Sequence, residues 1–338
     1  MTHHKLLTAY QKLSPGLERV YVIPDIEKFS THNSYLRLIY DPMIKENISK
    51  ISVESSSFLT PKFIFRRALG EKSVLHHHWF EIRNLKMLLN SIWKICSISL
   101  YRLAGGKVVW TAHNIEPHFQ GFRRLNLIFR RFWAKLPHKI HVHCQQAVAV
   151  MSPLLHVNED KFFVAEHPVY PAKIIPKNNA REMLRNIIPE RSNLSEKTVY
   201  LMFGYIAAYK GIREIVEIFR DLPLDRMLII AGPVKKNETA YFQQLQKLKK
   251  GKPNIILLKK YIPNEEMSIV LSAVDYAIFN FSNILTSGSV VLAQCYKKKI
   301  IIPNIGCLQE MSGPNIFKFD TLPQLRQILS GFQHPEKP

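Results

Sequence analysis

The stretch TVYLMFGYIAAYKGIREIVEIF, residues 198–219, passes from a short apolar run through a loop into a segment with helical periodicity. The apolar run ends at Gly204, and apolar residues from Ile212 to Phe219 recur at intervals that place them on one face of a helix. A strand, a loop and a helix follow one another within 22 residues. The stretch therefore predicts one strand of a parallel sheet and the helix that covers it.

The same alternation of short apolar runs and helix-sized segments continues along the chain. Strands that alternate with helices indicate an α/β protein, in which helices cover both faces of parallel sheets. The further predicted strands are 19–23, 73–79, 107–110, 139–144 and 161–166 in the first half, and 226–232, 254–259, 274–280 and 299–304 in the second.

With 338 residues, of which 46% are hydrophobic, the chain is long enough for two domains of ordinary size. Open parallel sheets bind ligands outside the carboxyl ends of their strands. We therefore expect two Rossmann-like domains that face each other across a cleft. The predicted boundaries are an N-terminal Rossmann-like domain over 1–170, a linker region over 171–197, a C-terminal Rossmann-like domain over 198–320 and a tail over 321–338.

The chain is strongly basic, with 47 Lys and Arg against 26 Asp and Glu and a formal net charge of +21. A field of this sign attracts phosphates, nucleic acid or an acidic membrane. No apolar run approaches the roughly 18 residues of a membrane-spanning helix, and the first residues lack the apolar core of a signal peptide. These features predict a soluble or peripheral protein.

The segment 283–299 contains a candidate phosphate site. Thr286, Ser287, Gly288 and Ser289 precede an apolar segment that is typical of a helix. A helix start offers unpaired backbone N–H groups and a partial positive charge, and a glycine allows close approach of a ligand oxygen. An ordinary Ser or Thr N-cap explains the same residues equally well.

Lys210 follows the strand that ends at Gly204, so its ammonium group is expected at the carboxyl edge of the sheet. There it could meet the same anion as a point charge. The alternative is a solvated loop lysine.

Titratable groups crowd the ends of two predicted strands in the first half. HHHWFE (76–81) contains Glu81, and VVWTAHNIEPHF (108–119) contains His113 and Glu116. A carboxylate or an imidazole at such a position can act as a general base, whereas Glu81 could instead be an acid that complements a helix dipole. Residues 76 and 78 lie on one side of the strand and 77 on the other, which gives no complete set of metal ligands.

A basic amphipathic helix is predicted over 121–140, where Phe, Leu and Trp alternate with Arg and Lys. Its apolar stripe could dock on the sheet, or the helix could lie at an anionic headgroup layer. The segment 83–107 has a similar composition.

FGYIAAYKGI, IIAGP, LTSGSVVLAQCYKKKIIIPNIGCLQEM and TAHNIEPH together resemble motifs of the glycosyltransferases with two Rossmann domains, known as GT-B. The resemblance is greatest to the bacterial enzymes that build exopolysaccharide, capsule or related glycolipids, and it covers about residues 74–311. It implies that the loop with Gly204, Tyr205 and Lys210 binds the donor diphosphate together with residues 286–289. It also implies that Tyr261 borders the nucleotide base and that His113 lies nearest the transferred sugar. By the same resemblance, the domain over 1–170 binds the acceptor and the domain over 198–320 binds the nucleotide sugar.

The sequence departs from that family at several positions. Leu285 and Ala293 stand where the common retaining members have two glutamates, and Tyr205 stands where many have an arginine. Phe119 replaces an acidic residue, which leaves Glu81 and Glu116 as alternative bases to His113. Inverting chemistry is therefore favoured over retaining chemistry.

The resemblance predicts a cytoplasmic enzyme, peripheral on the inner face of the cell membrane, that acts in bacterial surface polysaccharide synthesis. Its donor would be a nucleotide sugar such as a UDP- or GDP-sugar, with no further cofactor and no metal. Its acceptor would be a polyprenyl-linked lipid or an oligosaccharide, and an anionic membrane surface would be a partner. The alternatives are a nucleic-acid-binding protein, although no motif of that class is present, and a catalytically silent GT-B subunit.

Overall fold

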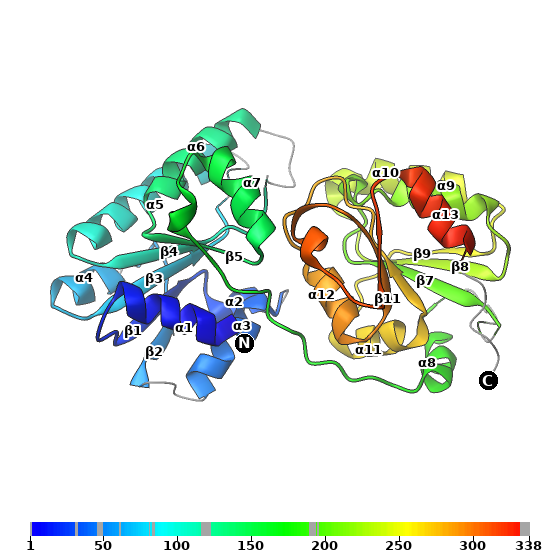
Figure 1. Cartoon of the computed structure of the whole chain (residues 1–338), viewed down its shortest axis with the longest axis horizontal. Coiled ribbons are helices and arrows are strands. Elements are labelled where there is room, and N and C mark those ends of the chain that lie inside the picture. The colour runs from blue at the N-terminus through cyan, green and yellow to red at the C-terminus, as the bar shows by residue number, and fades with distance from the viewer. Residues whose placement is uncertain are drawn as a thin grey trace. The chain divides into compact units, whose positions relative to one another are not determined.

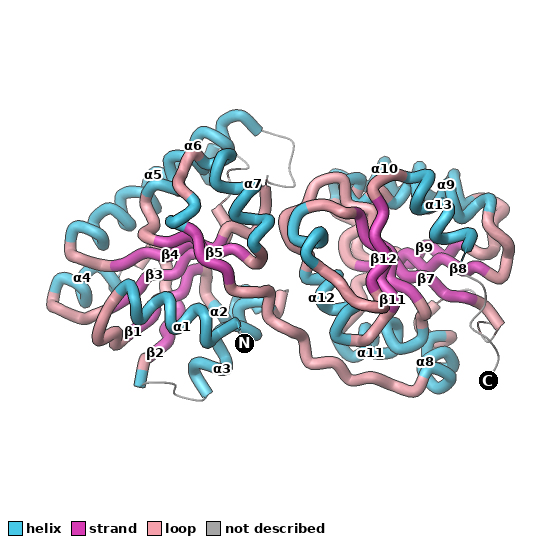
Figure 2. The backbone as a smooth tube through the Cα atoms, in the orientation of Figure 1, coloured by secondary structure: helices cyan, strands magenta, loops and turns pink. Residues whose placement is uncertain are grey.

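The computed structural model divides the chain into two units, Met1–Pro168 and Val169–Pro338. It describes residues 2–30, 33–45, 50–60, 62–80, 82, 85–115, 123–188, 194 and 196–331. Each unit contains a six-stranded parallel sheet with helices on both faces (Figure 1 and Figure 2). The predicted α/β architecture of two Rossmann-like units is confirmed.

The sheet of the first unit has the strand order β2-β1-β3-β4-β5-β6. Its strands are β1 (Arg19–Ile23), β2 (Ser52–Ser55), β3 (Ser73–His78), β4 (Lys107–Thr111), β5 (Lys139–Val142) and β6 (Phe162–Val164). Its helices are α1 (Thr2–Leu13), α2 (Ile26–Ser30), α3 (Tyr35–Lys45), α4 (Lys62–Ala68), α5 (Leu85–Leu103), α6 (Arg123–Lys135), α7 (Gln145–Leu155) and the 3-10 helix η2 (Glu159–Lys161).

The two faces of this sheet bury different side chains. Residues 74, 76 and 78 of β3 share a face with Val20 and Val109, and α1 and α3 cover that face with Tyr10 and Tyr40. The opposite face packs against α4, α5 and α6, where Trp133 contacts the His77 ring. The predicted separation of His76 and His78 from His77 is therefore confirmed.

The sheet of the second unit has the order β12-β11-β10-β7-β8-β9. Its strands are β7 (Thr198–Phe203), β8 (Arg226–Ala231), β9 (Ile255–Leu258), β10 (Tyr276–Ile278), β11 (Lys299–Pro303) and β12 (Ile316–Phe319). Its helices are α8 (Lys177–Leu184), α9 (Ile212–Asp221), α10 (Thr239–Lys249), α11 (Asn264–Ala273), α12 (Gly288–Cys295), α13 (Leu322–Gly331) and the 3-10 helices η3 (Ala208–Lys210), η4 (Lys236–Glu238) and η5 (Gly306–Glu310).

Alternate residues of the second sheet enter two separate cores. Leu201 and Ile229 pack toward α8, α11 and α12, whereas Met202 and Ile230 pack toward α9, α10 and α13. Figure 1 shows these two helix layers on opposite sides of the strands. Strands that are buried on both faces need the continuous apolar runs from which the sequence predicted them.

The unit boundary lies between Pro168 and Val169. The predicted linker region 171–197 contains α8, which packs against α11 and buries Ala180 and Leu184. The predicted tail 321–338 contains α13, which buries Leu325 in the core of the same unit. Both segments therefore contribute helices to the second unit.

Candidate functional site

The strand order of the second unit predicts a ligand crevice near the end of β7. Numbered within this unit, the order is 3-2-1-4-5-6, which reverses between β7 and β10. Neighbouring connections leave the sheet on opposite faces at such a point, so the loops after the two strands diverge and leave a crevice. The loop with Gly204 and Lys210 follows β7, and the loop before α12 follows β10.

Lys210 is buried at this point, with 7% of its surface exposed. It ends η3, and its Nζ donates a hydrogen bond of 2.8 Å to the Phe203 carbonyl at the end of β7. Burial, and then the charge of Lys235, lower the pKa of Lys210 to about 7. A buried ammonium group without a carboxylate partner among the described residues would be stabilised by a bound anion.

Gly204 keeps the space beside this ammonium open. Its φ of 85° is left-handed, and a Cβ atom would lie 2.8 Å from Lys210 Nζ and 3.6 Å from Ser289 Oγ. Only glycine adopts this backbone conformation easily while leaving that volume free. The structure therefore brings Gly204, Lys210 and Ser289 together, and their contact with a diphosphate stays a prediction.

Two loops at the switch point are tied to each other. Asn280, just after β10, donates from Nδ2 to the Gly211 carbonyl over 3.0 Å. Gly211 has a φ of 58°, and a Cβ atom would come within 2.3 Å of Asn280 Nδ2. This contact fixes the start of α9 against the end of β10.

The start of α12 shows the N-cap, and its phosphate site stays a prediction. Ser287 is the N-cap, and its Oγ accepts a hydrogen bond from Val290 N at 3.4 Å. The cap uses the hydroxyl of Ser287, while the N–H groups of Gly288 and Ser289 belong to the first turn, where no intrahelical acceptor exists. Thr286 precedes the cap in the same loop.

Tyr205 is half exposed, and Lys235 Nζ lies 4.9 Å from the centre of its ring. A bridge between Ile206 and Val234 joins the loops after β7 and β8, with Ile206 N donating to the Pro233 carbonyl at 3.0 Å. This pairing of loops brings Lys235 to the β7 end. Sequence reasoning missed Lys235, since it lies in a different loop from Lys210.

Tyr261 follows β9, the edge strand, and is 58% exposed. Within the part of the chain that the structure describes, no hydrogen bond, ion pair or ring contact joins it to Lys210 or to the start of α12. Its role beside a nucleotide base stays a prediction.

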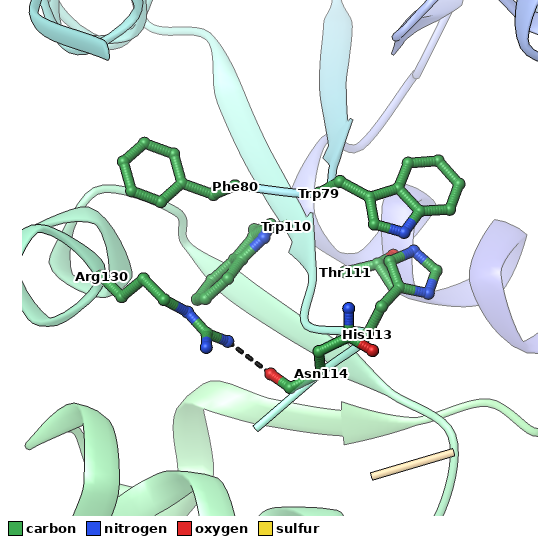
Figure 3. A pocket seen from close by; sticks show the side chains of 7 residues that line it. All are labelled: Trp79, Phe80, Trp110, Thr111, His113, Asn114 and Arg130. Carbon is green, nitrogen blue, oxygen red and sulfur yellow. Dashed lines mark hydrogen bonds between the residues drawn. The ribbon is translucent and has the colours of Figure 1, made fainter. Parts of the chain in front are cut away.

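His113 lies in the first unit, just beyond the carboxyl end of β4, and is 9% exposed. Its ring stacks on Trp79 with centres 4.3 Å apart and planes 8° apart, and the edge of Tyr35 faces it at 4.7 Å. Figure 3 shows His113 beside Trp79 in a small pocket that Trp110 and Arg130 also line. Burial, and then neighbouring imidazoles, hold the pKa of His113 well below its usual value, so the ring is neutral at pH 7.

Arg130 fixes the backbone that follows His113. Its guanidinium donates to the Ile115 carbonyl and, over 2.5 Å, to the Asn114 carbonyl (Figure 3). It also lies 5.9 Å from the Trp110 ring centre. An arginine of the predicted amphipathic helix therefore supports the loop from inside the unit.

A chain of buried hydrogen bonds starts from the Ala165 carbonyl, which can only accept. His141 Nε2 donates to it at 2.8 Å, so in the neutral ring Nδ1 accepts from the Thr111 hydroxyl at 2.9 Å. Because the Thr111 hydroxyl proton is donated to His141, the Thr111 oxygen can only accept, and it accepts from His76 Nε2 at 2.7 Å. His76 Nδ1 must therefore be an acceptor.

Two tyrosine hydroxyls compete for that acceptor. Tyr10 lies 2.5 Å and Tyr40 2.6 Å from His76 Nδ1, and the Tyr40 hydroxyl also lies 2.8 Å from His78 Nε2. If Tyr40 donates to His76, His78 Nε2 donates to Tyr40, and His78 Nδ1 accepts from His113 Nε2 at 3.2 Å. His113 Nδ1 then carries the lone pair that a general base requires.

If Tyr10 donates to His76 instead, Tyr40 donates to His78 and the proton positions beyond it reverse. His78 Nδ1 then donates to His113 Nε2, and His113 Nδ1 carries the proton. The tautomer of His113 thus depends on which of the two tyrosine hydroxyls donates to His76. Only the position of His113 was predicted from the sequence, because the chain joins residues that are up to 155 positions apart.

Glu81 and Glu116, the other predicted bases, lie outside the described residues. Among the residues that the structure does describe, no group of three or more His, Cys, Asp or Glu side chains could hold a metal ion. None of the described helices is both long and apolar enough to cross a bilayer.

No protein-family model matches the sequence, and no curated protein matches it significantly. Solved structures share its fold at low identity. HepE from Anabaena in complex with UDP is 14% identical with a TM-score of 0.63, covering 93% of this chain and 89% of that chain. A glycosyltransferase from Rickettsia africae is 14% identical with a TM-score of 0.61, covering 93% and 87%.

Sucrose-phosphate synthase from Thermosynechococcus elongatus is 12% identical with a TM-score of 0.63, covering 92% of this chain and 88% of that chain. These similarities extend over both units. The chain therefore has the GT-B fold, as the sequence motifs predicted.

Proposed function

We propose that this chain is a glycosyltransferase that moves a sugar from a nucleoside diphosphate sugar to an acceptor hydroxyl. The observation that carries the proposal is Lys210, a buried ammonium beside Gly204 and Ser289 at the switch point of the second sheet. HepE, which shares the fold, has been crystallised with UDP and with UDP-glucose. A diphosphate fits the chemistry of the described loop.

The donor diphosphate would contact three kinds of group. Lys210 would supply a charge, the first N–H groups of α12 would donate hydrogen bonds, and Lys235 would approach from the loop after β8. These groups would stabilise the negative charge of the leaving nucleoside diphosphate. We propose that no metal ion is needed, since fixed cations and a helix start perform that task.

His113 would act as the base in an inverting reaction. Its neutral imidazole would take the acceptor proton as the acceptor oxygen attacks the anomeric carbon and the bond to the diphosphate breaks. The lone pair on Nδ1 exists only in the tautomer in which Nε2 donates to His78. Glu81 and Glu116 remain alternative bases.

The acceptor would be a polyprenyl-linked or oligosaccharide substrate in the synthesis of a bacterial surface polysaccharide. The enzyme would then work in the cytoplasm, peripheral on the inner face of the cell membrane. A net charge of +21 supports attraction to anionic lipids. Net positive charge alone does not form a specific binding site for nucleic acid, and we propose no nucleic-acid partner.

Binding of the donor is tested first. UDP and GDP should each be added in a thermal unfolding series, and at least one should raise the midpoint, because a ligand that binds only the folded state stabilises it. Lys210→Met should lose this protection. Lys298→Met is the matched control, since Lys298 is a partly buried lysine of the same unit that donates to the Ser272 and Val274 carbonyls.

Transfer is tested with a panel of nucleotide sugars and a membrane lipid extract as acceptor, followed by NMR of the new linkage. An inverted anomeric configuration is expected. No transfer together with no specific protection by any nucleotide would refute the proposed function. Protection without transfer by the wild type would instead support a catalytically silent GT-B subunit.

A further inference from the structure

The first unit contains a cavity of about 530 Å³ that the sequence did not predict. It lies at the carboxyl ends of β1 and β2, and the turn of α5 with Asn90 and Trp93 closes one side. The strand order of this sheet reverses between β1 and β3, so the loop after β1, which lines the cavity, borders a topological switch point.

The cavity lining combines polar side chains with the ammonium group of Lys94. Ser56, Thr60 and Asn90 line it, and Lys94 forms no ion pair with any described residue. Lys94 Nζ lies 5.8 Å from the Phe58 ring centre, and burial lowers the pKa of Lys94. A partly buried ammonium among hydroxyl groups favours an anionic, hydrogen-bonding ligand.

The loop that forms the cavity wall is fixed to α5. Trp93 Nε1 donates to the Phe58 carbonyl at 2.6 Å, while half of the Trp93 surface stays exposed. Asp25 also lines the cavity, where it accepts from Lys28 N at 2.9 Å and Lys28 itself stands beside it. The wall is therefore held before a ligand arrives.

An exposed apolar stripe on α5 extends from this cavity. With Cys96, which is also exposed, the exposed positions recur about every three or four residues from Leu89 to Leu103, a rise of about 21 Å along the helix. The opposite face of α5 buries Ile98 and Tyr101 in the unit. The large apolar side chains of the stripe are between 49% and 84% exposed, and they are Leu89, Ile92, Trp93, Leu100 and Leu103.

Helix α4 packs beside α5 and extends the same surface with Phe65 (71% exposed) and, just beyond its end, Leu69 (88% exposed). Leu59, at the cavity wall, is 81% exposed. The sequences of α4 and α5 contain no acidic residue. Their basic residues are Lys62, Arg66, Arg67, Lys86, Lys94 and Arg102. Of these, Arg66 forms an ion pair with Glu54, and Arg67 donates to the Glu71 carbonyl.

Apolar side chains in a stripe, together with cations and no acids, are the features of a helix that lies in the interface of an anionic membrane. We propose that the α4–α5 surface, defined by Leu59, Phe65, Leu69 and the α5 stripe, docks on a bilayer, and that the adjoining cavity binds the phosphate headgroup of a lipid. Hydrocarbon would lie along the stripe while Lys94 and the hydroxyl groups bind the phosphate. This inference rests on the proposed function in one respect, since the bound lipid phosphate would be the acceptor or part of it.

Helix α6, the membrane helix that the sequence suggested, is a weaker candidate. It buries Trp133 in the unit, and Arg130 and Arg131 donate to backbone carbonyls of the first unit. Its exposed apolar residues are reduced to Ile128 and Phe132. The α6 surface therefore serves as the control in the test.

Flotation assays should compare three vesicle types: phosphatidylcholine alone, phosphatidylcholine with phosphatidylglycerol, and phosphatidylcholine with a polyprenyl monophosphate at the same surface charge. The wild-type chain should float with both charged vesicles and more strongly with the polyprenyl phosphate. Equal flotation with the two charged vesicles would overturn the headgroup cavity, because surface charge alone would then explain binding.

Variants separate the stripe from the cavity. Leu100→Glu and Leu103→Glu should each weaken flotation with all charged vesicles by about tenfold, equivalent to about 1.4 kcal/mol. Phe132→Glu, an identical charge change at an exposed apolar residue of α6, should float like the wild type. Lys94→Gln should keep flotation with phosphatidylglycerol and lose the preference for polyprenyl phosphate.

Flotation of Leu103→Glu at the wild-type level, or loss of flotation in Phe132→Glu alone, would overturn the docking surface. So would a wild-type dimer in light scattering that Leu100→Glu dissociates, because a second copy would then cover the stripe. Thermal protection by UDP is measured in the same samples. Lipid binding without UDP protection would contradict the donor site of the proposed function and leave the docking surface intact. UDP protection without lipid binding would contradict this inference and leave the donor site intact.

Discussion

His78 Nδ1 and His113 Nε2 lie 3.2 Å apart inside the first unit, and a single proton lies between these two neutral rings. Which ring holds it depends on Tyr10 and Tyr40, whose hydroxyls lie 2.5 and 2.6 Å from His76 Nδ1. The base that we propose for the reaction is therefore set by groups on α1 and α3 that reach no substrate themselves.

The tyrosine pair predicts opposite behaviour for two similar variants. Tyr10→Phe leaves Tyr40 as the donor to His76, which fixes the lone pair on His113 Nδ1. Tyr40→Phe breaks the connection to His78, so the tautomer of His113 is no longer imposed. We expect one His113 tautomer by ¹⁵N NMR in Tyr10→Phe and a mixture in Tyr40→Phe.

In the same pair of variants, Tyr40→Phe should lower kcat about tenfold and leave KM for the donor unchanged. A general base typically contributes 10²–10⁴-fold to the rate, and loss of the correct tautomer should remove part of that contribution. Tyr10→Phe should keep kcat. Equal losses in both variants would show that the hydroxyls matter only for packing.

The low pKa of Lys210 predicts that nucleotide binding depends on pH. The free protein has this pKa at about 7, and a bound diphosphate raises it. Affinity for UDP should therefore be greatest below pH 7 and fall up to tenfold per pH unit above it. Calorimetric titration across this range measures the effect, which Lys210→Met should abolish and Lys298→Met should retain.

Gly204 and Gly251 form a matched pair for backbone strain. Both have a left-handed φ, 85° and 76°, but a Cβ atom would lie 2.8 Å from Lys210 Nζ at Gly204 and would meet nothing within 4 Å at Gly251. Each change to Ala should cost about 1–2 kcal/mol of stability in denaturant unfolding. Only Gly204→Ala should also weaken UDP binding, and an equal effect of Gly251→Ala would contradict the site.

Lys235 should contribute to donor binding although no motif in the sequence pointed to it. Lys235→Ala removes the cation beside Tyr205 and should weaken UDP binding several-fold, as expected for an exposed charge near a phosphate. Lys259→Ala is the control, since Lys259 makes a similar contact with Phe242 over 5.7 Å. The difference between the variants should shrink as salt is raised.

Acid should unfold the first unit before the second. All histidines except His334 lie in the first unit, and burial lowers the pKa of His141 and His167 to about 4. Since these rings are neutral when folded and charge when unfolded, stability is full above about pH 6.5 and is lost between pH 6.5 and 4. Each such ring removes about 1.4 kcal/mol per pH unit.

The four tryptophans also lie in the first unit, so their fluorescence reports on that unit alone. We expect the fluorescence transition in urea to move to lower urea as pH falls, whereas the UDP-protected transition of the second unit moves less. Coincident shifts of both transitions would contradict the assignment of acid sensitivity to the histidines.

Ten of the twelve strands were predicted from their apolar runs, and the two that were missed, β2 and β12, are edge strands. An edge strand is covered incompletely, so Ser52–Ser55 needs few apolar residues and leaves no periodic signal. Incomplete burial also explains why the sequence of α8 resembled a linker. Only Ala180, Arg181 and Leu184 of this polar helix are buried.

The sequence by itself determined the alternation of strands and helices, the glycine and lysine of the β7 loop, and the position of His113, because each depends on neighbours along the chain. Tertiary structure alone decided that Lys235 meets Tyr205, that His78 meets His113, and that α5 keeps an apolar face exposed. Contacts of this kind join separate loops at one sheet edge. Their formation depends on strand order, which no local pattern of residues specifies.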